Sequence, residues 1–426
     1  MVVTMENVII NDNVSLHYIS MTKLKTTSAA IYIHRPLNNE EASYNALLPS
    51  VLKSGTELCP DREAVAKYLG NLYGATMGGT TLKCGEDHII YFDAETISDR
   101  YAPEGEPLTA DLLNLLMSVI FAPKLQDGAF DKKVVEQEKI NAADKIDVFI
   151  NDKRLYASSR CQEETARGTD FAIGRLGDKD VISSITPKTL YDHYRAIITS
   201  SPIDIYLCGD ADIKAAETVI RRYTDKLSFT AAQLPKTDIL QRDITELHNV
   251  SEEMDVSQGK LSMGFLTNVK PNDSDYYALV VFNSVFGAGA HSKLFNNVRE
   301  KLSLAYYASS QLERFKGMLV VNAGIEFDKF RSAYDETLAQ LKEIQNGNIT
   351  EHEFNSSISS IINTFNSYYD DQRALATCNL MNKIAGTDKT LDEMIEIVKS
   401  VTVADVVAVS KKLMLDTVYF LKGRDK

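Results

Sequence analysis

Seven histidines are the first residues to consider for metal-assisted chemistry, because imidazole is among the commonest zinc ligands in proteins. They stand at positions 17, 34, 88, 193, 248, 291 and 352. The closest two are 17 positions apart, whereas a helical zinc motif places two histidines one turn apart. The sequence therefore excludes a helical two-histidine zinc site.

A second combination of metal-ligating residue types occurs where Cys84, Glu86 and His88 alternate along the chain. Alternate residues of a strand share one face, and thiolate, carboxylate and imidazole are all acceptable zinc ligands. Neighbours on one strand face do not by themselves converge on an ion, however, and Gly85 indicates a turn or bulge. We expect no functional metal at these residues.

Two long runs resemble a known family. The run FGAGAHSKLFNNVREKLSLAYYASSQLERFKGMLVV resembles the C-terminal signature of the M16 family, which includes pitrilysin and mitochondrial processing peptidase. The run FAIGRLGDKDVISSITPKTLYDHYRAIITSSPIDIYLCGDAD resembles the segment that leads into the closing strand of the family's first domain. The resemblance spans nearly the whole chain. It implies two similar α+β halves that close like a clamshell over an unfolded peptide.

Active members of this family carry HxxEH on a helix, where two histidines bind Zn²⁺ and the glutamate activates water. The resemblance aligns this motif with ALLPS in the stretch NALLPSVLKSGT, so that Ala46, Pro49 and Ser50 replace the three working residues. Alanine has no lone pair, proline cannot act as a general base, and a serine hydroxyl alone is a poor zinc ligand. The aligned helix therefore predicts no catalytic residue, no metal and no cofactor.

The run VVEQEKINAADK resembles the family segment that supplies the third zinc ligand. The resemblance places Glu138 at the position of a supporting glutamate and Lys145 at the position of the ligand itself. An ammonium group has no lone pair for a metal. Without ligands nearby, Glu138 belongs either to a solvated helix face or to a residual polar contact inside the chamber.

Arg299 and Tyr306 match an arginine and a tyrosine that, in active members of the family, reach toward the bound peptide. Arginine can donate to a carbonyl or carboxylate, and tyrosine can donate to a scissile carbonyl oxygen. The alternative is an internal ion pair for Arg299 and a packed ring for Tyr306. Both interpretations stay open at this point.

Residue patterning predicts the elements that position these residues. Strands are expected over residues 7–19, 29–34 and 203–209, a hairpin over 76–97, and helices over 42–53, 110–120, 130–159 and 211–223. Asp61 is a plausible N-cap for the helix that follows it. Strands and helices come in blocks rather than in strict alternation, which is typical of α+β proteins.

The second half of the chain repeats this order of elements. At an offset of 232 positions, Ala46 matches Ala278, Gly55 matches Gly287 and Gly85 matches Gly317. We predict an N-terminal half over 1–227, a linker over 228–252 and a C-terminal half over 253–426. Each half is expected to be an α/β sandwich of an antiparallel-type sheet and helices.

Composition limits the class of protein. With 44% hydrophobic and 25% charged residues, the chain of 426 residues matches a globular protein. A net charge of −13 argues against a nucleic-acid partner. No signal peptide or apolar run of membrane-spanning length is evident, and five scattered cysteines without CxxC fit buried, reduced thiols. We therefore expect a cytoplasmic protein that does not associate with a membrane.

The preferred functional hypothesis is a non-catalytic subunit that binds peptide and forms a heterodimer with an active, zinc-bearing M16 homologue. ALLPSVLKSGTE, NLYGA and FAPKLQDGAF resemble most an inactive bacterial type of the family that accompanies such a homologue. Two alternatives remain open. One is a zinc-dependent metalloendopeptidase with a non-standard site, and the other is a stand-alone, homodimeric peptide-binding scaffold.

Overall fold

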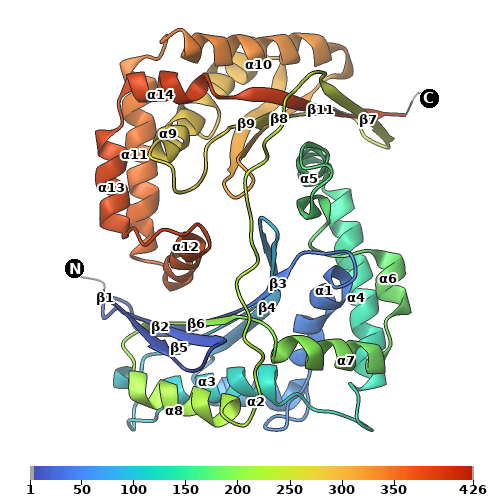
Figure 1. Cartoon of the computed structure of the whole chain (residues 1–426), viewed down its shortest axis with the longest axis vertical. Helices are drawn as coiled ribbons and strands as arrows, with labels where there is room; N and C mark the ends of the chain where they lie inside the picture. The colour runs from blue at the N-terminus through green and yellow to red at the C-terminus, as the bar shows by residue number, and fades with distance from the viewer. Residues whose placement is uncertain (1–3, 425–426) are drawn as a thin grey trace. The chain divides into compact units, whose positions relative to one another are not determined.

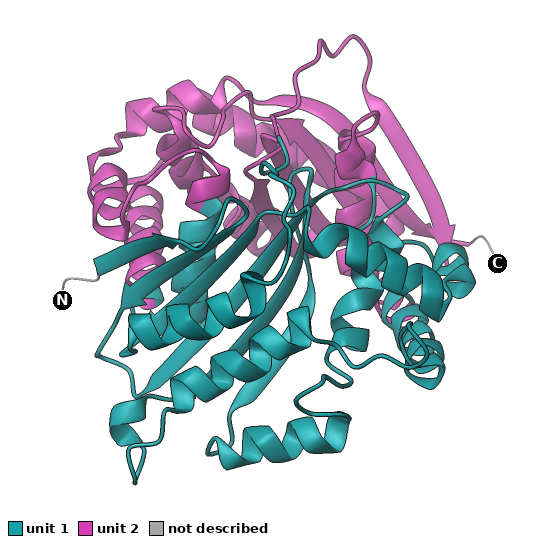
Figure 2. Ribbon diagram, turned by 60° about the horizontal axis from the view of Figure 1, so that its bottom comes forward, with its two compact units in different colours: residues 1–146, 173–236, 368–381 teal, residues 147–172, 237–367, 382–426 magenta. Residues whose placement is uncertain are grey.

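Two β-sheets with packed helices form the chain in the computed structural model, which describes residues 4–424 (Figure 1). The predicted α+β class is confirmed. The chain divides into two compact units, coloured teal and magenta in Figure 2. Unit 1 comprises the described residues up to Ile146 together with Ile173–Lys236 and Tyr368–Met381, and unit 2 comprises Asp147–Ala172, Thr237–Ser367 and the described residues from Asn382 onward.

Unit 1 contains a six-stranded sheet in the order β1-β2-β6-β3-β5-β4, in which only β2 and β6 run parallel. The strands are β1 (Thr4–Ile9), β2 (Val14–Ser20), β3 (Thr26–Pro36), β4 (Thr76–Cys84), β5 (Asp87–Ile97) and β6 (Ile203–Gly209). The segment 7–19 is thus a hairpin rather than one strand. Asn11 makes the turn, because its side chain accepts hydrogen bonds from the backbone N–H groups of Asn13 and Val14.

Helices cover one face of this sheet. The α-helices of unit 1 are α1 (Ala42–Leu52), α2 (Arg62–Asn71), α3 (Leu108–Phe121), α4 (Lys132–Asn151, up to Ile146), α6 (Lys179–Ser184), α7 (Pro187–Ile198), α8 (Ile213–Thr224) and the first part of α12 (Gln372–Ile384, up to Met381). Alternate residues of β3, such as Ile31 and Ile33, share one buried core with Leu47 and Leu48 of α1. The predicted helix start at Asp61 is confirmed, since its side chain accepts from the backbone N–H of Ala64.

Unit 2 contains a five-stranded sheet in the order β7-β11-β8-β10-β9. Its strands are β7 (His248–Met254), β8 (Gly259–Leu266), β9 (Ala305–Glu313), β10 (Met318–Ile325) and β11 (Met414–Gly423). Its helices are α5 (Lys153–Thr165), α9 (Tyr276–Phe286), the π-helix η3 (Leu294–Lys301), α10 (Phe330–Gln345), α11 (Glu351–Tyr368, up to Ser367), the end of α12 (Gln372–Ile384), α13 (Leu391–Ser400) and α14 (Val403–Ser410). The first part of α12 belongs to unit 1.

The two sheets repeat one topology. A parallel pair, β2 with β6 or β7 with β11, lies on one side of a central antiparallel strand, β3 or β8, and a hairpin lies on the other side. The hairpin turns hold Gly85 at φ 60° and Gly317 at φ 57°, a backbone region that glycine enters without steric cost. These glycines are 232 positions apart, as the sequence comparison of the halves predicts. The structure thus supports two similar halves.

The two units are not continuous in sequence. Residues 147–172 lie before the predicted boundary at 227 but belong to unit 2, while residues 368–381 lie in the C-terminal half but belong to unit 1. The predicted linker 228–252 is irregular only as far as residue 247, because β7 begins at His248 and pairs with β11. Strand pairing and helix docking therefore define the units, rather than order along the chain.

The predicted helix over 130–159 is two helices. It breaks after Asn151 because Asp152 adopts a non-helical backbone and its side chain caps α5 by accepting from the backbone N–H of Leu155. The break lets α5 pack on β8, β10 and β11 within unit 2. Cys161 of α5 contributes to a small core with Val320 and Tyr419.

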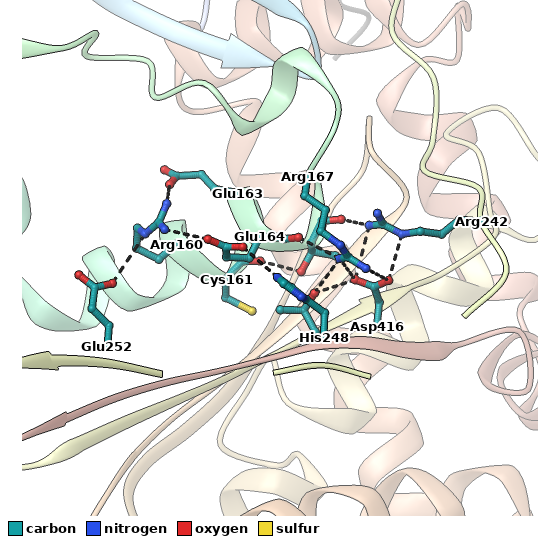
Figure 3. Close-up of polar contacts among 11 residues, drawn as sticks. Arg160, Cys161, Glu163, Glu164, Arg167, Arg242, His248, Glu252 and Asp416 are labelled. Atoms are coloured by element: carbon teal, nitrogen blue, oxygen red, sulfur yellow. Dashed lines mark hydrogen bonds and ion pairs between the residues drawn. The ribbon is translucent and has the colours of Figure 1, made fainter. Parts of the chain in front are cut away.

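A polar network also fixes α5 on this sheet (Figure 3). Asp416 of β11 has a fully buried side chain, and its carboxylate pairs with Arg167 at 2.6 Å and with Arg242 at 3.0 Å. Within α5, Arg160 pairs with Glu163 and Glu164 of the last turn. The network joins α5, β11 and the segment that precedes β7.

Four of the five cysteines are buried and Cys378 is half-buried, in line with the predicted buried thiols. Within residues 4–424, none of the helices combines the length and the apolar composition that crossing a membrane requires.

Candidate functional site

The aligned zinc helix is α1, which packs against β4 and β5 of unit 1. Leu47, Leu48 and Pro49 are buried, whereas Ala46 and Ser50 are half-exposed on its outer side. Pro49 lies inside the helix rather than at its first turn. Its ring removes one backbone donor, but the helix continues to Leu52 because the flanking leucines anchor it in the core.

Ser50 of α1 and Lys145 of α4 are brought together, although 95 positions separate them in the sequence. The Lys145 ammonium donates to Ser50 Oγ over 3.4 Å. The resemblance aligns these two residues with two zinc ligands, and the geometry is consistent with that alignment. An ammonium and a hydroxyl meet where two metal ligands are expected.

Glu138 is only 4% exposed, so the expectation of a solvated helix face is wrong. Its carboxylate pairs with Arg62, the first residue of α2, and the same guanidinium donates to Ser54 Oγ over 3.0 Å. Ser54 Oγ in turn donates to the carbonyl oxygen of Ser50. Glu138 therefore makes a residual polar contact, and its charge is balanced by Arg62.

Lys53 is a residue of this site that the sequence analysis missed. It follows α1 directly, is half-buried, and its ammonium donates to the carbonyl oxygen of Gly79 over 3.5 Å. Burial lowers the pKa of Lys53, and the charge of Lys145 lowers it further. The sequence could have indicated Lys53, because it lies three positions after Ser50 and residues at that spacing share a helix face.

These side chains do not fit a zinc ion. Ala46, Pro49 and Lys145 offer no donor atom, and the ammonium groups of Lys53 and Lys145 would repel a divalent cation. Across the described part of the chain, no three His, Cys, Asp or Glu residues are grouped closely enough to hold a metal ion. No chemical step through a metal can therefore be assigned to this site.

Cys84, Glu86 and His88 do not share one strand face. Cys84 ends β4, Glu86 lies in the turn beside Gly85, and His88 belongs to β5. His88 is buried, with Nε2 located 3.1 Å from the Arg175 carbonyl oxygen, and burial lowers its pKa to about 4. The turn at Gly85 and Glu86 therefore separates Cys84 from His88.

The free edge of β4 lies beside this site. β4 ends the sheet and pairs only with β5 within the described residues. Lys53 and Arg175 donate to the carbonyl oxygens of Gly79 and Thr81, two positions apart, so this row of backbone groups points away from β5. Thr81 is buried beneath Arg175, whereas Thr76–Thr80 are exposed or half-exposed. An extended chain could pair with this open part of the edge.

Arg299 and Tyr306 belong to unit 2. Arg299 lies on η3, with its guanidinium over the Phe295 ring at 4.7 Å and 3.4 Å from the carboxylate of Glu300. Tyr306 lies on β9, is 53% exposed, and donates to Glu326 over 3.2 Å. The ring of Tyr306 is therefore not packed in a core, and the ion pair of Arg299 with Glu300 lies at the surface. Both side chains are accessible.

Comparison with known proteins identifies the family. The chain is 33% identical over 409 residues to the "Probable inactive metalloprotease YmfF" of Bacillus subtilis, which covers 96% of each chain. The chain belongs to the peptidase M16 family. Residues 184–361 match the family profile described as "Peptidase M16 inactive domain". The missing ligands agree with this assignment, so the chain is an inactive-type M16 homologue.

Two further comparisons concern a second relative and a solved structure. The chain is 23% identical over 308 residues, 70% of its length and 72% of the other, to the "Uncharacterized zinc protease YmxG" of Bacillus subtilis. The crystal structure of a conserved protein from Enterococcus faecalis V583 superposes with a TM-score of 0.91 and 28% identity over 99% of each chain. The M16 fold thus extends over nearly the whole chain.

Restoring the M16 ligand set should create a zinc site. In the combined variant Ala46→His, Pro49→Glu, Ser50→His and Lys145→Glu, we expect about one zinc per chain, because three ligands then converge. The measurement is metal content after dialysis, by plasma emission spectrometry. The matched control keeps Lys145 and should bind zinc at least about tenfold more weakly. Absence of zinc from both variants would show that the alignment of these positions is wrong.

Proposed function

We propose that this chain is a non-catalytic M16 subunit that binds peptide and pairs with a zinc-bearing M16 homologue in proteolytic processing. The observation that carries the proposal is the combination at α1 and β4. The residues aligned with metal ligands cannot bind zinc, yet the strand edge beside them stays open. Because the metal ligands are lost while the edge of β4 stays open, this chain is suited to bind a peptide without cleaving it.

An open strand edge recognises extended peptides through the main chain. Backbone groups supply hydrogen bonds, while side chains of the bound peptide alternate between the two faces. The half-exposed residues Gly78 and Gly79 have no side chain that could obstruct a peptide next to the edge. This surface suits an unfolded polypeptide of varied sequence rather than one fixed motif.

Arg299 and Tyr306 are the peptide contacts proposed for unit 2. Each side chain is accessible and carries a donor whose present acceptor is an exposed or nearby glutamate, Glu300 or Glu326. A peptide carbonyl can compete with such exposed acceptors at little cost, because surface ion pairs contribute little. In the proposed complex these donors would orient the substrate of the partner subunit.

The zinc-bearing partner is proposed from family membership. M16 homologues named zinc proteases exist among the relatives of this chain, including one from the same organism as the inactive relative. A heterodimer would supply the ligands that this chain lacks. A cytoplasmic location is part of the same proposal and is supported by the buried cysteines.

The test is peptide cleavage by this chain alone, by a co-expressed zinc-bearing M16 homologue alone, and by their mixture, with zinc quantified in each. We expect cleavage to rise at least about tenfold in the mixture, with zinc on the partner. Arg299→Ala should lower that rate by about tenfold, because a charge-assisted hydrogen bond contributes roughly 1.5 kcal/mol or more. Arg331→Ala, which removes an exposed arginine of α10, is the matched control.

Other outcomes would favour the other functions. Cleavage by this chain alone would favour a peptidase with a non-standard site. Tight peptide binding by a homodimer, without any effect on the partner, would favour a scaffold. Either result would contradict the heterodimer.

A further inference from the structure

Two ammonium groups lie near one another at the degenerate metal site, and we call Lys53 and Lys145 the ammonium pair. Their hydrogen bonds, to Gly79 at 3.5 Å and to Ser50 at 3.4 Å, are longer than the usual 2.9–3.0 Å for this type of bond. An ammonium has three donors. The pair therefore retains donor capacity for an additional acceptor.

Nearby carboxylates offset the charge of the ammonium pair only in part, because Asp93 and Glu138 act on Lys53 but each also pairs with an arginine. Glu138 pairs with Arg62, and Asp93 pairs with Arg373 at 3.0 Å. Asp144 precedes Lys145 on α4, but adjacent residues on a helix do not face each other. The site thus holds an excess of positive charge, although the chain as a whole carries a net charge of −13.

The electrostatics favour an anion at this position. Burial lowers the pKa of Lys53, and repulsion from Lys145 lowers it further, so the two positive charges interact in a partly desolvated place. A negative group between them would relieve this repulsion. Ser50 Oγ adds a hydroxyl that can donate to the same anion.

We propose that the ammonium pair and Ser50 bind the C-terminal carboxylate of a peptide that lies along the free edge of β4. The inference rests on the peptide binding in the proposed function and specifies its ligand. An internal peptide carbonyl is neutral and needs no second cation, whereas a carboxylate has two oxygens that can each accept from one ammonium.

The position of Lys53 links the carboxylate to the strand edge. Its ammonium now donates to the Gly79 carbonyl, which belongs to the row of acceptors that a docked peptide would use. If an N–H group of the docked peptide donates to the Gly79 carbonyl oxygen, it replaces the long hydrogen bond from Lys53. The Lys53 ammonium is then available to donate to the carboxylate. The chain would therefore select peptides that end beside α1, the kind of fragment that hydrolysis of a peptide bond releases.

The experiment measures binding of the full-length chain to an N-terminally labelled octapeptide library without Asp or Glu, by fluorescence anisotropy. The library is made in two forms, one ending in a free carboxylate and the other in an amide. We expect the carboxylate form to bind about 10–100-fold more tightly, because two charge-assisted hydrogen bonds are lost in the amide.

Three variants locate the effect. Lys145→Gln and Lys53→Met should each reduce the preference for the carboxylate form to less than about threefold, while affinity for the amide form stays unchanged. Lys133→Gln is the control, because Lys133 is an exposed lysine near the start of α4, the helix that carries Lys145. This variant should keep the preference for the carboxylate form. An amidated library with an internal Asp tests side-chain carboxylates as the alternative source of the anion.

Three results would overturn the inference. Equal binding of both forms would refute it and leave peptide binding by this chain intact. Equally tight binding of the amidated, Asp-containing library would assign the site to side-chain carboxylates. If neither form binds, the peptide-binding part of the proposed function is refuted as well.

Discussion

Replacing Asp416 with asparagine is expected to destabilise unit 2 by about 3 kcal/mol. The carboxylate is fully buried and pairs with Arg167 at 2.6 Å and Arg242 at 3.0 Å, and Thr417 Oγ1 donates to it over 2.6 Å. Asparagine keeps the shape but leaves two guanidiniums without their anion. Because both arginine side chains are partly exposed, the loss should lie at the low end of the range for buried ion pairs.

Hydrogen exchange of β11 and β8 amides is the measurement for this prediction, since it reports unit 2 separately from unit 1. We expect roughly 100-fold faster exchange of the most protected amides. Asp335→Asn is the matched control, because Asp335 forms an exposed ion pair with Arg331 in the same unit. Equal effects of the two variants would contradict a structural role for the network in Figure 3.

The network also predicts acid sensitivity. Burial by itself would raise the pKa of Asp416, but hydrogen bonds from Arg167 and Thr417 and the charge of Arg242 hold that pKa below its usual value. The stabilisation is therefore present above the ordinary aspartate pKa and is lost as the pH falls through the lowered one. Asp416→Asn should remove this part of the pH dependence.

Replacing His34 with glutamine is expected to destabilise unit 1 by about 3–5 kcal/mol near neutral pH. His34 is 1% exposed, with Nδ1 located 2.6 Å from Asp87 and Nε2 located 3.2 Å from Asp204. Asp204 also lies 2.7 Å from His17 Nε2. Glutamine would remove the charge that balances two buried carboxylates.

The pH dependence of this cluster has the opposite sign. Burial alone would lower the pKa of His34, but Asp87 and Asp204 outweigh burial and raise it to about 9. A raised pKa in the folded state gives stability that is complete below the unfolded value of 6.5 and is lost as the pH rises through about 9. Burial also raises the pKa of Asp87, which acts in the same direction.

Hydrogen exchange of β3 amides at pH 6.5 and pH 10 tests this prediction. After correction for intrinsic exchange rates, the chain should lose up to about 3 kcal/mol of local stability between the two conditions. His34→Gln should show little of this loss, whereas His352→Gln, at an exposed histidine, should retain it. An unchanged pH dependence in His34→Gln would show that His34 is neutral in the folded chain.

Most elements followed from local patterning, because apolar residues at strand or helix spacing can be buried in only one way. The helix at 42–53, the hairpin at 76–97 and the cap at Asp61 are confirmed nearly to the residue. The segments 7–19 and 130–159 were predicted as single elements, since the turn at Asn11 and the cap at Asp152 depend on side-chain hydrogen bonds that periodicity does not report.

The sequence by itself determined what the site lacks. Ala46, Pro49, Ser50 and Lys145 cannot supply a zinc ligand set in any conformation, because their atoms lack the necessary lone pairs or acidity.

Only the tertiary structure decided what stands there instead. Arg62 reaches Glu138 across 76 positions, and Lys145 reaches Ser50 across 95. Such contacts arise when packed helices bring distant charges together, and burial then fixes which charges must be paired. Tertiary packing also decided which segments belong to which unit. α5 docks on the sheet of unit 2 through buried contacts that no local sequence pattern encodes.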